Sequence, residues 1–315
     1  MNDKFISLSN RIAKNYKHLR KMMHKSQIEA YRIYDRDLPE FPFAIDIYAN
    51  HLHIQEYDTG WKISEQDYQE WIDNVIQAVC AASNIDIKNI HLKKRSRQRG
   101  TLQYEKQNIN SADFVVMENN LRFFINLDTY LDSGLFLDHR NLRSHIKKES
   151  AGKRFLNLFA YTGSFTVYAV AGGAIYSETV DLSNTYLDWA KRNFILNNIN
   201  DENHCVIRQD VFVYLQNAIA EKKKFDLIVM DPPTFSNSKK MTDILDIQRD
   251  HIKLIEQAMQ LLDFDGILYF SNNLRTFVLD KSIMQKYLVT DISLKTIPND
   301  FRNKKIHYCW KIKHR

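Results

Sequence analysis

Three aspartates in the second half of the chain end short apolar runs. Asp181 ends the run 174–181, Asp210 ends the run 204–210, and Asp231 ends the run 225–231. Amphipathic stretches separate these runs, so they are predicted strands of a parallel sheet, in which ligands bind at the carboxyl ends. An uncompensated row of carboxylates would repel itself. We therefore expect the three side chains to bind a ligand.

The loop after the predicted strand 153–160 favours a particular class of cofactor. It carries one glycine, Gly163, whereas a dinucleotide site needs the pattern G-x-G-x-x-G to hold a pyrophosphate. An acid at the end of the next strand, here Asp181, is suited to accept hydrogen bonds from ribose hydroxyls. Both features favour a nucleoside without phosphates, such as S-adenosylmethionine. In this interpretation Asp210 takes the adenine amino group and Gly163 lies beside the amino-acid end.

The tripeptide Asp231-Pro232-Pro233 follows another predicted strand, and we predict that these residues are the catalytic ones. Two prolines stiffen a turn and remove two amide donors, which leaves carbonyl acceptors. An ionised aspartate also only accepts hydrogen bonds. Guanine, whose Watson–Crick edge presents N1–H and N2–H donors, suits this row of hydrogen-bond acceptors better than adenine.

Cysteine chemistry is not indicated by this sequence. Methylation at pyrimidine C5 needs a cysteine nucleophile, and none lies near Asp231 in the sequence. A ring nitrogen such as guanine N7 has its own lone pair and needs only positioning. The three cysteines (Cys80, Cys205 and Cys309) are far apart and include no C-x-x-C pair, so we predict neither a disulfide framework nor a metal site.

The elements that must position these residues alternate between strands and helices. Predicted strands cover 153–160, 174–181, 204–210, 225–231 and 266–272, and predicted helices cover 164–171, 185–197, 211–221 and 246–262. Two more β-like runs, 288–297 and 305–313, have only a loop between them. This order predicts an α/β fold with a doubly wound, seven-stranded sheet that ends in an antiparallel hairpin.

The N-terminal part predicts a smaller α+β unit. A hairpin is expected from 42–48 and 51–57, and a helix capped by Ser64 from 64–83; three further strands are expected at 89–95, 113–118 and 121–127. Residues 129–150 form a bridging segment that is helical after Gly134. The expected domains are a basic N-terminal helix (1–30), an α+β accessory domain (31–128) and a catalytic domain (129–315).

Basic residues gather in two places of the N-terminal part. The predicted helix 9–25 has an apolar face and an opposite basic face, which is either a solvated surface or a surface that faces phosphates. Its basic face comprises Arg11, Lys14, Lys17, His18, Lys21 and Lys25. A second cluster near Gly100 is either a solvated loop or an RNA contact, and Asn272 and Asn273 either form a turn or contact a base. The residues predicted to contact RNA are Lys93, Lys94, Arg95, Arg97, Arg99, Asn272, Asn273 and Arg275.

The composition is that of a globular protein. The 315 residues include 44 Lys+Arg against 38 Asp+Glu, a formal net charge of +6, with 44% hydrophobic and 26% charged residues. The 18 Phe, 16 Tyr and 4 Trp exclude global disorder. No apolar run approaches the roughly 20 residues that a membrane span needs, and the N-terminus lacks the apolar core of a secretory signal. We expect a soluble, cytoplasmic protein without a membrane partner.

Several longer motifs resemble a known family. The runs FLNLFAYTGSFT, TVDLS, FDLIVMDPPTFSNSKKM, DIQRDH and YFSNN resemble the C-terminal half of the bifunctional large-subunit rRNA guanine methyltransferases. The upstream runs KNYKHLRK, YRIYDRDLPEF and SGLFLDHR resemble the same half, so the resemblance covers almost the entire chain. The joined motif DPPTFSNSKKM and QRDH makes it specific, whereas a lone D-P-P would be weak.

This resemblance implies a class I, Rossmann-like methyltransferase that uses S-adenosyl-L-methionine and forms 7-methylguanine in helix 74 of 23S rRNA or of a large-subunit precursor. The cofactor-binding residues that we predict are Asp138, Arg140, Phe159, Tyr161, Thr162, Gly163, Ser164, Asp181, Leu182, Asp210, Val211 and Asp231. The family's N-terminal half, with its RNA-binding module and N2-guanine methyltransferase, has no counterpart in this sequence. We therefore expect no such second activity from this sequence. Either a separate protein opens helix 74, or the sequence is a piece of a longer chain.

Two rival functions stay open at this point. One is methylation of another guanine position, such as N2, or of another RNA. The other is an RNA-binding ribosome assembly factor whose cofactor pocket is vestigial. The intact acids Asp181, Asp210 and Asp231 argue against a decayed pocket.

Overall fold

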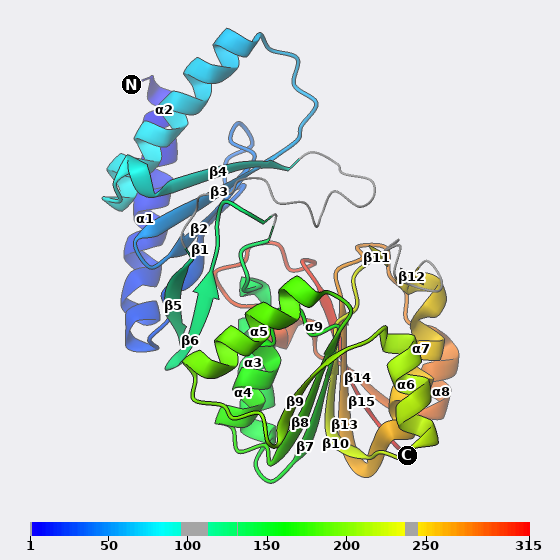
Figure 1. The fold of residues 1–315 in the computed structure, drawn as a ribbon. Coiled ribbons are helices and arrows are strands. Elements are labelled where there is room, and N and C mark those ends of the chain that lie inside the picture. Colours follow the sequence, from blue (N-terminus) through cyan, green and yellow to red (C-terminus); the bar gives the residue numbers. More distant parts are fainter. Residues whose placement is uncertain (1, 96–112, 131, 237–244) are drawn as a thin grey trace. The chain divides into compact units, whose positions relative to one another are not determined.

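The chain forms two compact units in a computed structural model, which describes residues 2–95, 113–130, 132–236 and 245–315. The first unit comprises Met1–Ser133 and Asn299–Arg302, and the second comprises Gly134–Pro298 and Asn303–Arg315. Figure 1 shows the elements of each unit. Among the described residues, no helix combines the length and the apolar character needed to cross a bilayer.

The first unit is built on a four-stranded sheet with the order β1-β2-β3-β4. Neighbouring strands are antiparallel except for β3 and β4, which are parallel and are connected through α2. The predicted hairpin is confirmed, because Tyr48 pairs with His51 across a turn in which Ala49 has φ 55°. The elements are α1 (Asp3–Lys25), β1 (Ala30–Asp35), β2 (Phe43–Tyr48), β3 (His51–Tyr57), α2 (Glu65–Ser83), η1 (Ile87–Asn89), β4 (Ile90–Arg95), β5 (Phe114–Glu118) and β6 (Leu121–Ile125).

Strand β1 was not predicted, because a charged residue interrupts its apolar pattern. Arg32 is buried in the middle of β1 and donates to both carboxylate oxygens of Asp46 on β2, at 2.7 and 3.0 Å. The guanidinium also lies over the ring of Phe301, 4.4 Å from its centre. Asp300 accepts a hydrogen bond from the Arg32 amide at 2.9 Å. These contacts explain why Asn299–Arg302 belongs to the first unit.

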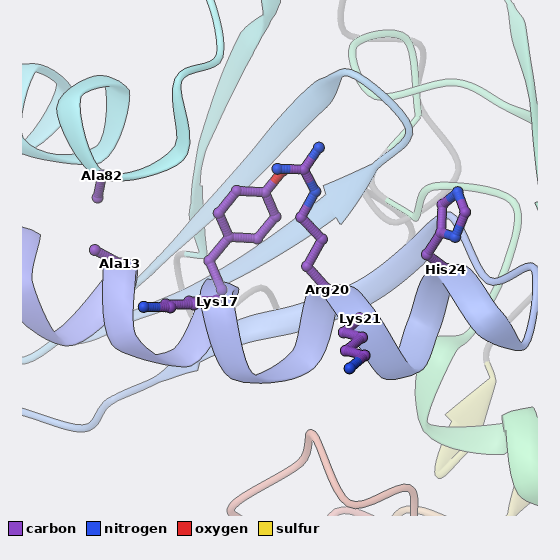
Figure 2. A pocket seen from close by; sticks show the side chains of 7 residues that line it. Ala13, Lys17, Arg20, Lys21, His24 and Ala82 are labelled. Atoms are coloured by element: carbon purple, nitrogen blue, oxygen red, sulfur yellow. The ribbon is translucent and has the colours of Figure 1, made fainter.

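Helix α1 separates an apolar face from a basic one, as its sequence pattern predicts. Leu8, Ile12, Leu19 and Met23 are buried, whereas the basic side chains on the opposite face are exposed. Figure 2 shows part of this basic face beside the end of α2. The predicted cap of α2 is confirmed, since Ser64 Oγ accepts a hydrogen bond from the Asp67 amide at 3.1 Å.

The second unit contains the predicted seven-stranded sheet, with the order β14-β15-β13-β10-β7-β8-β9. Strands β13, β10, β7, β8 and β9 are parallel, and β15 is antiparallel to both β13 and β14. The strands are β7 (Arg154–Leu158), β8 (Tyr176–Asp181), β9 (His204–Arg208), β10 (Phe225–Met230), β13 (Leu262–Asn272), β14 (Leu288–Asp291) and β15 (Tyr308–Lys313), and a small pair is formed by β11 (Phe235–Ser236) and β12 (Leu245–Asp246).

The predicted helices connect these strands along the chain. They are α4 (Ser164–Ala171), α5 (Asn184–Leu196), α6 (Val211–Ala220) and α7 (Ile247–Leu261), and they are accompanied by η3 (Leu137–His139), α3 (Arg140–Glu149), α8 (Lys281–Lys286) and α9 (Ser293–Thr296). The predicted terminal hairpin is confirmed in its antiparallel pairing, but its first run is not one strand. Strand β14 ends at Asp291, whose carboxylate accepts from the Ser293 amide at 2.8 Å, and α9 follows.

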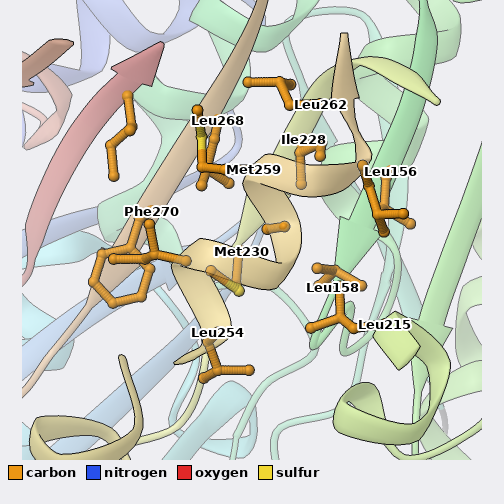
Figure 3. Close-up of a cluster of buried hydrophobic side chains, with 14 of the residues drawn as sticks. Leu156, Leu158, Leu215, Ile228, Met230, Leu254, Met259, Leu262, Leu268 and Phe270 are labelled. Carbon is orange, nitrogen blue, oxygen red and sulfur yellow. The ribbon is translucent and has the colours of Figure 1, made fainter. Parts of the chain in front are cut away.

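The second unit has a buried cluster on each face of its sheet, and the larger one lies between the central strands and α6 and α7. Leu156, Leu158, Ile228, Met230 and Phe270 come from β7, β10 and β13 and are fully buried. Figure 3 shows these side chains together with Leu254 and Met259 of α7. Buried central strands are typical of a parallel sheet that is covered by helices, and they hold the strand ends in fixed positions.

Candidate active site

The carboxyl ends of four neighbouring strands bring the predicted acids to one edge of the sheet. Strand β7 lies between β10 and β8, and the chain winds in opposite directions on either side of it (Figure 1). This is the topological switch point at which open α/β sheets bind ligands. Asp231 follows β10, Phe159 follows β7, Asp181 ends β8 and Asp210 follows β9.

The loop after β7 has an unusual backbone conformation. Phe159, Tyr161 and Gly163 have positive φ angles of 57°, 51° and 72°. Bulky residues rarely adopt this region, and such strain persists only where the surroundings impose it. Thr162 Oγ1 donates to the Gly134 carbonyl at 2.7 Å, and Asn193 Nδ2 donates to the Thr162 carbonyl at 2.9 Å. The loop is therefore held in one shape before any ligand binds.

Packing against α5 also requires the glycine of this loop. A Cβ atom on Gly163 would lie 3.0 Å from Ala190 Cβ and 3.0 Å from the Phe194 ring. A side chain there would strain the backbone and crowd the helix at the same time. This packing is a structural reason for the glycine that the sequence analysis did not consider.

Asp181 is held by backbone amides and not by a cation. Its Oδ2 accepts from the Tyr161 amide at 2.9 Å, and its Oδ1 accepts from the Ser183 amide at 2.8 Å. Burial raises the pKa of Asp181 to about 6, although these amides favour the ionised form. A partly buried carboxylate that is held by neutral amides is suited to additional neutral donors such as ribose hydroxyls.

Asp231 lies in a different environment, next to a pair of stacked histidines. His139 Nε2 is 3.2 Å from Asp231 Oδ2 and 3.8 Å from Asp138 Oδ2. His307 Nδ1 contacts the same Asp138 oxygen at 2.9 Å. The two imidazole rings are 4.6 Å apart with an interplanar angle of 8°. Asp138 and Asp231, both predicted site residues, thus meet through His139.

The charges in this cluster shift each other's pKa values. Burial disfavours the charged form of His139, but the carboxylates of Asp231 and Asp138 outweigh it and raise its pKa. Burial also opposes ionisation of Asp231, yet the adjacent His139 lowers the pKa of this carboxyl. His139 and His307 likewise overcome burial and lower the pKa of Asp138. Each ionised group is therefore stabilised by an opposite charge.

Sequence reasoning missed both histidines. His139 stands beside Asp138 in the motif SGLFLDHR, but His307 comes 168 residues later, and only the sheet brings the two together. Asp138, His139 and His307 could together offer three atoms to a metal ion. Their geometry is poorly suited to one, because the lone pairs of parallel imidazoles do not converge and His307 Nε2 is already 3.0 Å from Thr296 Oγ1.

Asp210 has a structural role of its own. Its Oδ1 accepts from the Phe212 amide at 2.9 Å and from the Val213 amide at 3.3 Å, so it caps α6. The premise of an uncompensated row of carboxylates is wrong, because amides or histidines compensate each of the three acids. Ser164 and Val211 begin α4 and α6, Leu182 follows β8, and Arg140 is buried at the start of α3.

The predicted RNA-contacting asparagines close the edge beside Asp231. Asn273 Oδ1 accepts from Thr234 Oγ1 at 2.6 Å, which ties the end of β13 to the D-P-P-T segment. Asn272 Oδ1 accepts from the Leu274 amide at 3.1 Å. Its Nδ2 atom is buried and has no hydrogen-bond partner among the described residues. Arg275 is exposed on the loop that follows.

The second predicted basic cluster is only partly described. Lys93 Nζ donates to the carbonyl of Tyr130, and Lys94 Nζ lies 4.3 Å from the centre of the Tyr68 ring. Both ammonium groups therefore have contacts within the first unit. Only the backbone of Arg95 is described, and Arg97 and Arg99 lie outside the described residues.

One cysteine lies near Asp231 in space although none does in the sequence. Cys309 pairs with Ser271 between β15 and β13 and is fully buried. Burial, together with the charges of Asp231 and Asp291, raises the pKa of this thiol well above its usual value. A buried, protonated thiol is a poor nucleophile. The expectation that no cysteine lies near Asp231 is therefore wrong for the folded protein. The Cys309 thiol is nevertheless unsuited to attack a base.

Comparison with known proteins places the chain in a family. A family model described as S-adenosylmethionine-dependent methyltransferase matches residues 65–289. The chain is 61% identical over 307 residues to ribosomal RNA large subunit methyltransferase K of Neisseria meningitidis serogroup B, covering 98% of this chain and 87% of that protein. The chain belongs to this methyltransferase family. Its cofactor is S-adenosylmethionine, as predicted.

Further relatives are longer. The chain is 47% identical over 305 residues to ribosomal RNA large subunit methyltransferase K/L of Pseudomonas savastanoi pv. phaseolicola, covering 96% of this chain but 40% of that protein. The fold also matches the crystal structure of SMU.776 complexed with SAH, with a TM-score of 0.78, 25% identity, and coverage of 99% and 81% of the two chains. The resemblance to half of a bifunctional enzyme is therefore confirmed.

The described residues at the switch point suit this cofactor. Asp181 provides a partly buried carboxylate that is held by two backbone amides, and the loop after β7 is fixed in shape. The loop after β7 contains a single glycine, Gly163, which agrees with a ligand that carries no pyrophosphate.

Proposed function

We propose that this methyltransferase transfers a methyl group to N7 of a guanine in helix 74 of 23S rRNA, without a covalent intermediate. The relatives named ribosomal RNA large subunit methyltransferase K and K/L support an rRNA substrate. The observation that carries the choice of atom is the acceptor-rich edge at Asp231, whose nearest thiol, Cys309, is buried and protonated.

The cofactor side of the proposed site is the end of β7 and β8. S-adenosylmethionine, when bound, supplies a methyl group that its sulfonium makes electrophilic. Asp181 holds the ribose diol, and the backbone of Tyr161 to Ser164 shapes the wall beside the amino-acid end. The hydrogen bonds from Thr162 to Gly134 and from Asn193 to Thr162 keep this wall rigid, which favours catalysis by positioning.

The substrate side is the end of β10 and β13. His139 occupies Oδ2 of Asp231, and Oδ1 has no partner among the described residues. This acceptor suits the N1–H or N2–H donor of guanine. Pro232 and Pro233 have no backbone N–H to donate beside Asp231, so hydrogen-bond acceptors orient the base at this edge.

The product tests this proposal directly. Methylated N7 gives guanine a positive charge, which makes the strand cleavable after borohydride reduction and aniline treatment. RNA methylated by the purified protein should break at one guanine of helix 74, and RNA incubated without the cofactor serves as the control. Methyl transfer without cleavage would contradict the N7 assignment and make N2 the leading alternative.

A second measurement separates an enzyme from an assembly factor with a vestigial pocket. We expect the folded protein to bind labelled S-adenosylmethionine and to methylate rRNA taken from a strain that lacks this gene. A protein that binds RNA but neither binds nor turns over the cofactor would contradict the proposal. Mass mapping of rRNA from the deletion strain identifies the nucleotide.

A further inference from the structure

Most cations on the basic face of α1 have no ion-pair partner among the described residues. Arg11 differs, since its Nε lies 3.9 Å from Asp37 Oδ2. Helix α1 carries one acid, Asp3, against seven Lys and Arg residues (Lys4, Arg11, Lys14, Lys17, Arg20, Lys21 and Lys25). Within the described parts of the chain, Lys14, Lys17, Arg20, Lys21 and Lys25 form no ion pair or hydrogen bond through their side chains, and all are exposed. Unpaired cations on one surface create a field that attracts anions.

A hollow of about 530 Å³ lies on one side of this face. Four of its seven lining residues are Lys17, Arg20, Lys21 and His24, and none of the seven is acidic. Figure 2 shows these side chains on successive turns of α1, with Ala82 from the end of α2 facing Ala13. The guanidinium of Arg20 lies 5.6 Å from the centre of the Tyr16 ring, which restrains its planar fork.

We infer that the basic face of α1 binds the phosphate backbone of RNA, with one phosphate held in the hollow by Lys17, Arg20 and Lys21. The inference rests on the proposed function, because an rRNA substrate is the polyanion that this enzyme must hold. From Lys14 to Lys25 the face extends about 16 Å along the helix, at ~1.5 Å per residue. That length suits several consecutive phosphates and not a single small anion.

The apolar face of α1 argues against an anionic membrane as the partner. Membrane-surface helices insert an apolar face into the lipid. Here Leu8, Ile12, Leu19 and Met23 form that face, and they are buried in the core of the first unit. Lys93 and Lys94, the members of the second basic cluster whose side chains are described, already have contacts within the first unit.

Salt-dependent binding tests the inference. Each phosphate neutralised by a basic residue contributes roughly 0.7–0.9 to the slope of log affinity against log salt. We expect the variant K17Q/K21Q to lower this slope by about 1.5 for an RNA that contains helix 74, measured by fluorescence anisotropy. Its affinity deficit relative to the parent should then shrink about 8-fold between 50 and 200 mM salt. Cofactor affinity and thermal stability should stay unchanged, because both lysines are exposed.

The matched control removes two lysines elsewhere. Lys222 and Lys224 precede β10, at the sheet edge opposite to Asp231, and both are exposed. The variant K222Q/K224Q should keep the slope of the parent. An unchanged slope in K17Q/K21Q would overturn the inference, as would an equal loss in the control. Loss of binding to phosphatidylserine vesicles with an unchanged RNA slope would assign the face to a membrane. A lowered slope together with a product other than 7-methylguanine would overturn the proposed function alone.

Discussion

Asp181 ends β8 and Asp231 follows β10, on either side of β7 at the same edge of the sheet, yet their surroundings differ in kind. Backbone amides of Tyr161 and Ser183 hold Asp181, and burial raises its pKa to about 6. His139 lies against Asp231, and the imidazolium charge lowers the pKa of that carboxyl despite burial. The carboxyl of Asp181 thus has a pKa close to neutral pH, whereas that of Asp231 is kept ionised.

The difference shows that the partner of a carboxylate, and not its place in the fold, decides its chemistry. Neutral donors leave Asp181 ready to gain more hydrogen bonds from a ligand. The charged partner of Asp231 fixes one oxygen and keeps the whole group an acceptor at physiological pH. We therefore expect Asp181 to govern cofactor affinity and Asp231 to govern turnover of the RNA.

The largest effect is expected at Asp181. In the variant Asp181→Ala, the cofactor loses two charge-assisted hydrogen bonds, and about 2–4 kcal/mol of binding free energy should disappear. This corresponds to a roughly 30- to 900-fold higher Kd in isothermal titration calorimetry. A folded variant with near-parental affinity would contradict the ribose contact.

Changes at Asp231 should act on a different quantity. The variant Asp231→Asn replaces one acceptor oxygen by an NH₂ donor that faces guanine's own donors, at a cost of ~1–3 kcal/mol. We expect kcat/KM for RNA methylation to fall by about 10- to 100-fold while the Kd of the cofactor changes little. If cofactor affinity falls as much as it does for Asp181→Ala, the two aspartates do not have separate tasks.

The dependence on pH sharpens the same comparison. Because the pKa of Asp181 in the folded protein is about 6, above the ordinary value of 3.8, the free energy of unfolding falls as the pH rises from about 4 to about 6 and is level above that range. Hydrogen bonds from the cofactor favour the ionised form, so protonation weakens binding below that pH. We expect the Kd to be roughly 10-fold higher at pH 5 than at pH 7.

The variant Asp181→Asn is the control for this titration, because an amide does not ionise. Its Kd should be the same at pH 5 and pH 7, and should be higher than that of the parent protein at pH 7. If the Kd of the variant still changes between pH 5 and pH 7, the titrating group is another one, such as His139.

The smallest effect is expected from the cysteines. Replacement of Cys80, Cys205 and Cys309 by alanine should leave the turnover number within about 2-fold of the parent, because N7 attacks without a covalent adduct. Steady-state methyl transfer checks this, with circular dichroism as the control for folding since Cys309 is buried. A loss of activity in a folded triple variant would show that a cysteine thiol takes part in catalysis.

Periodic patterns were enough to predict most of the architecture. The strands next to Asp181 and Asp231 are short apolar runs, and in the structure they are buried almost continuously. Strand β1 could not be predicted, because the buried charge of Arg32 has the sequence signature of a loop while its partner Asp46 lies on another strand. The role of His307 could not be predicted for a related reason, since it is far from Asp138 in the sequence and only the folded sheet brings the two into contact.

The short segment Asn299–Arg302 has a consequence for dividing this chain into pieces. It provides the Asp300 carboxylate and the Phe301 ring that contact Arg32, although it is separated from the rest of the first unit by more than half of the chain. A fragment that ends at Ser133 would leave the guanidinium side of the buried pair with Asp46 open to water. The two units are thus interleaved along the gene, and neither can be exchanged, fused or circularly permuted as a cassette with one junction.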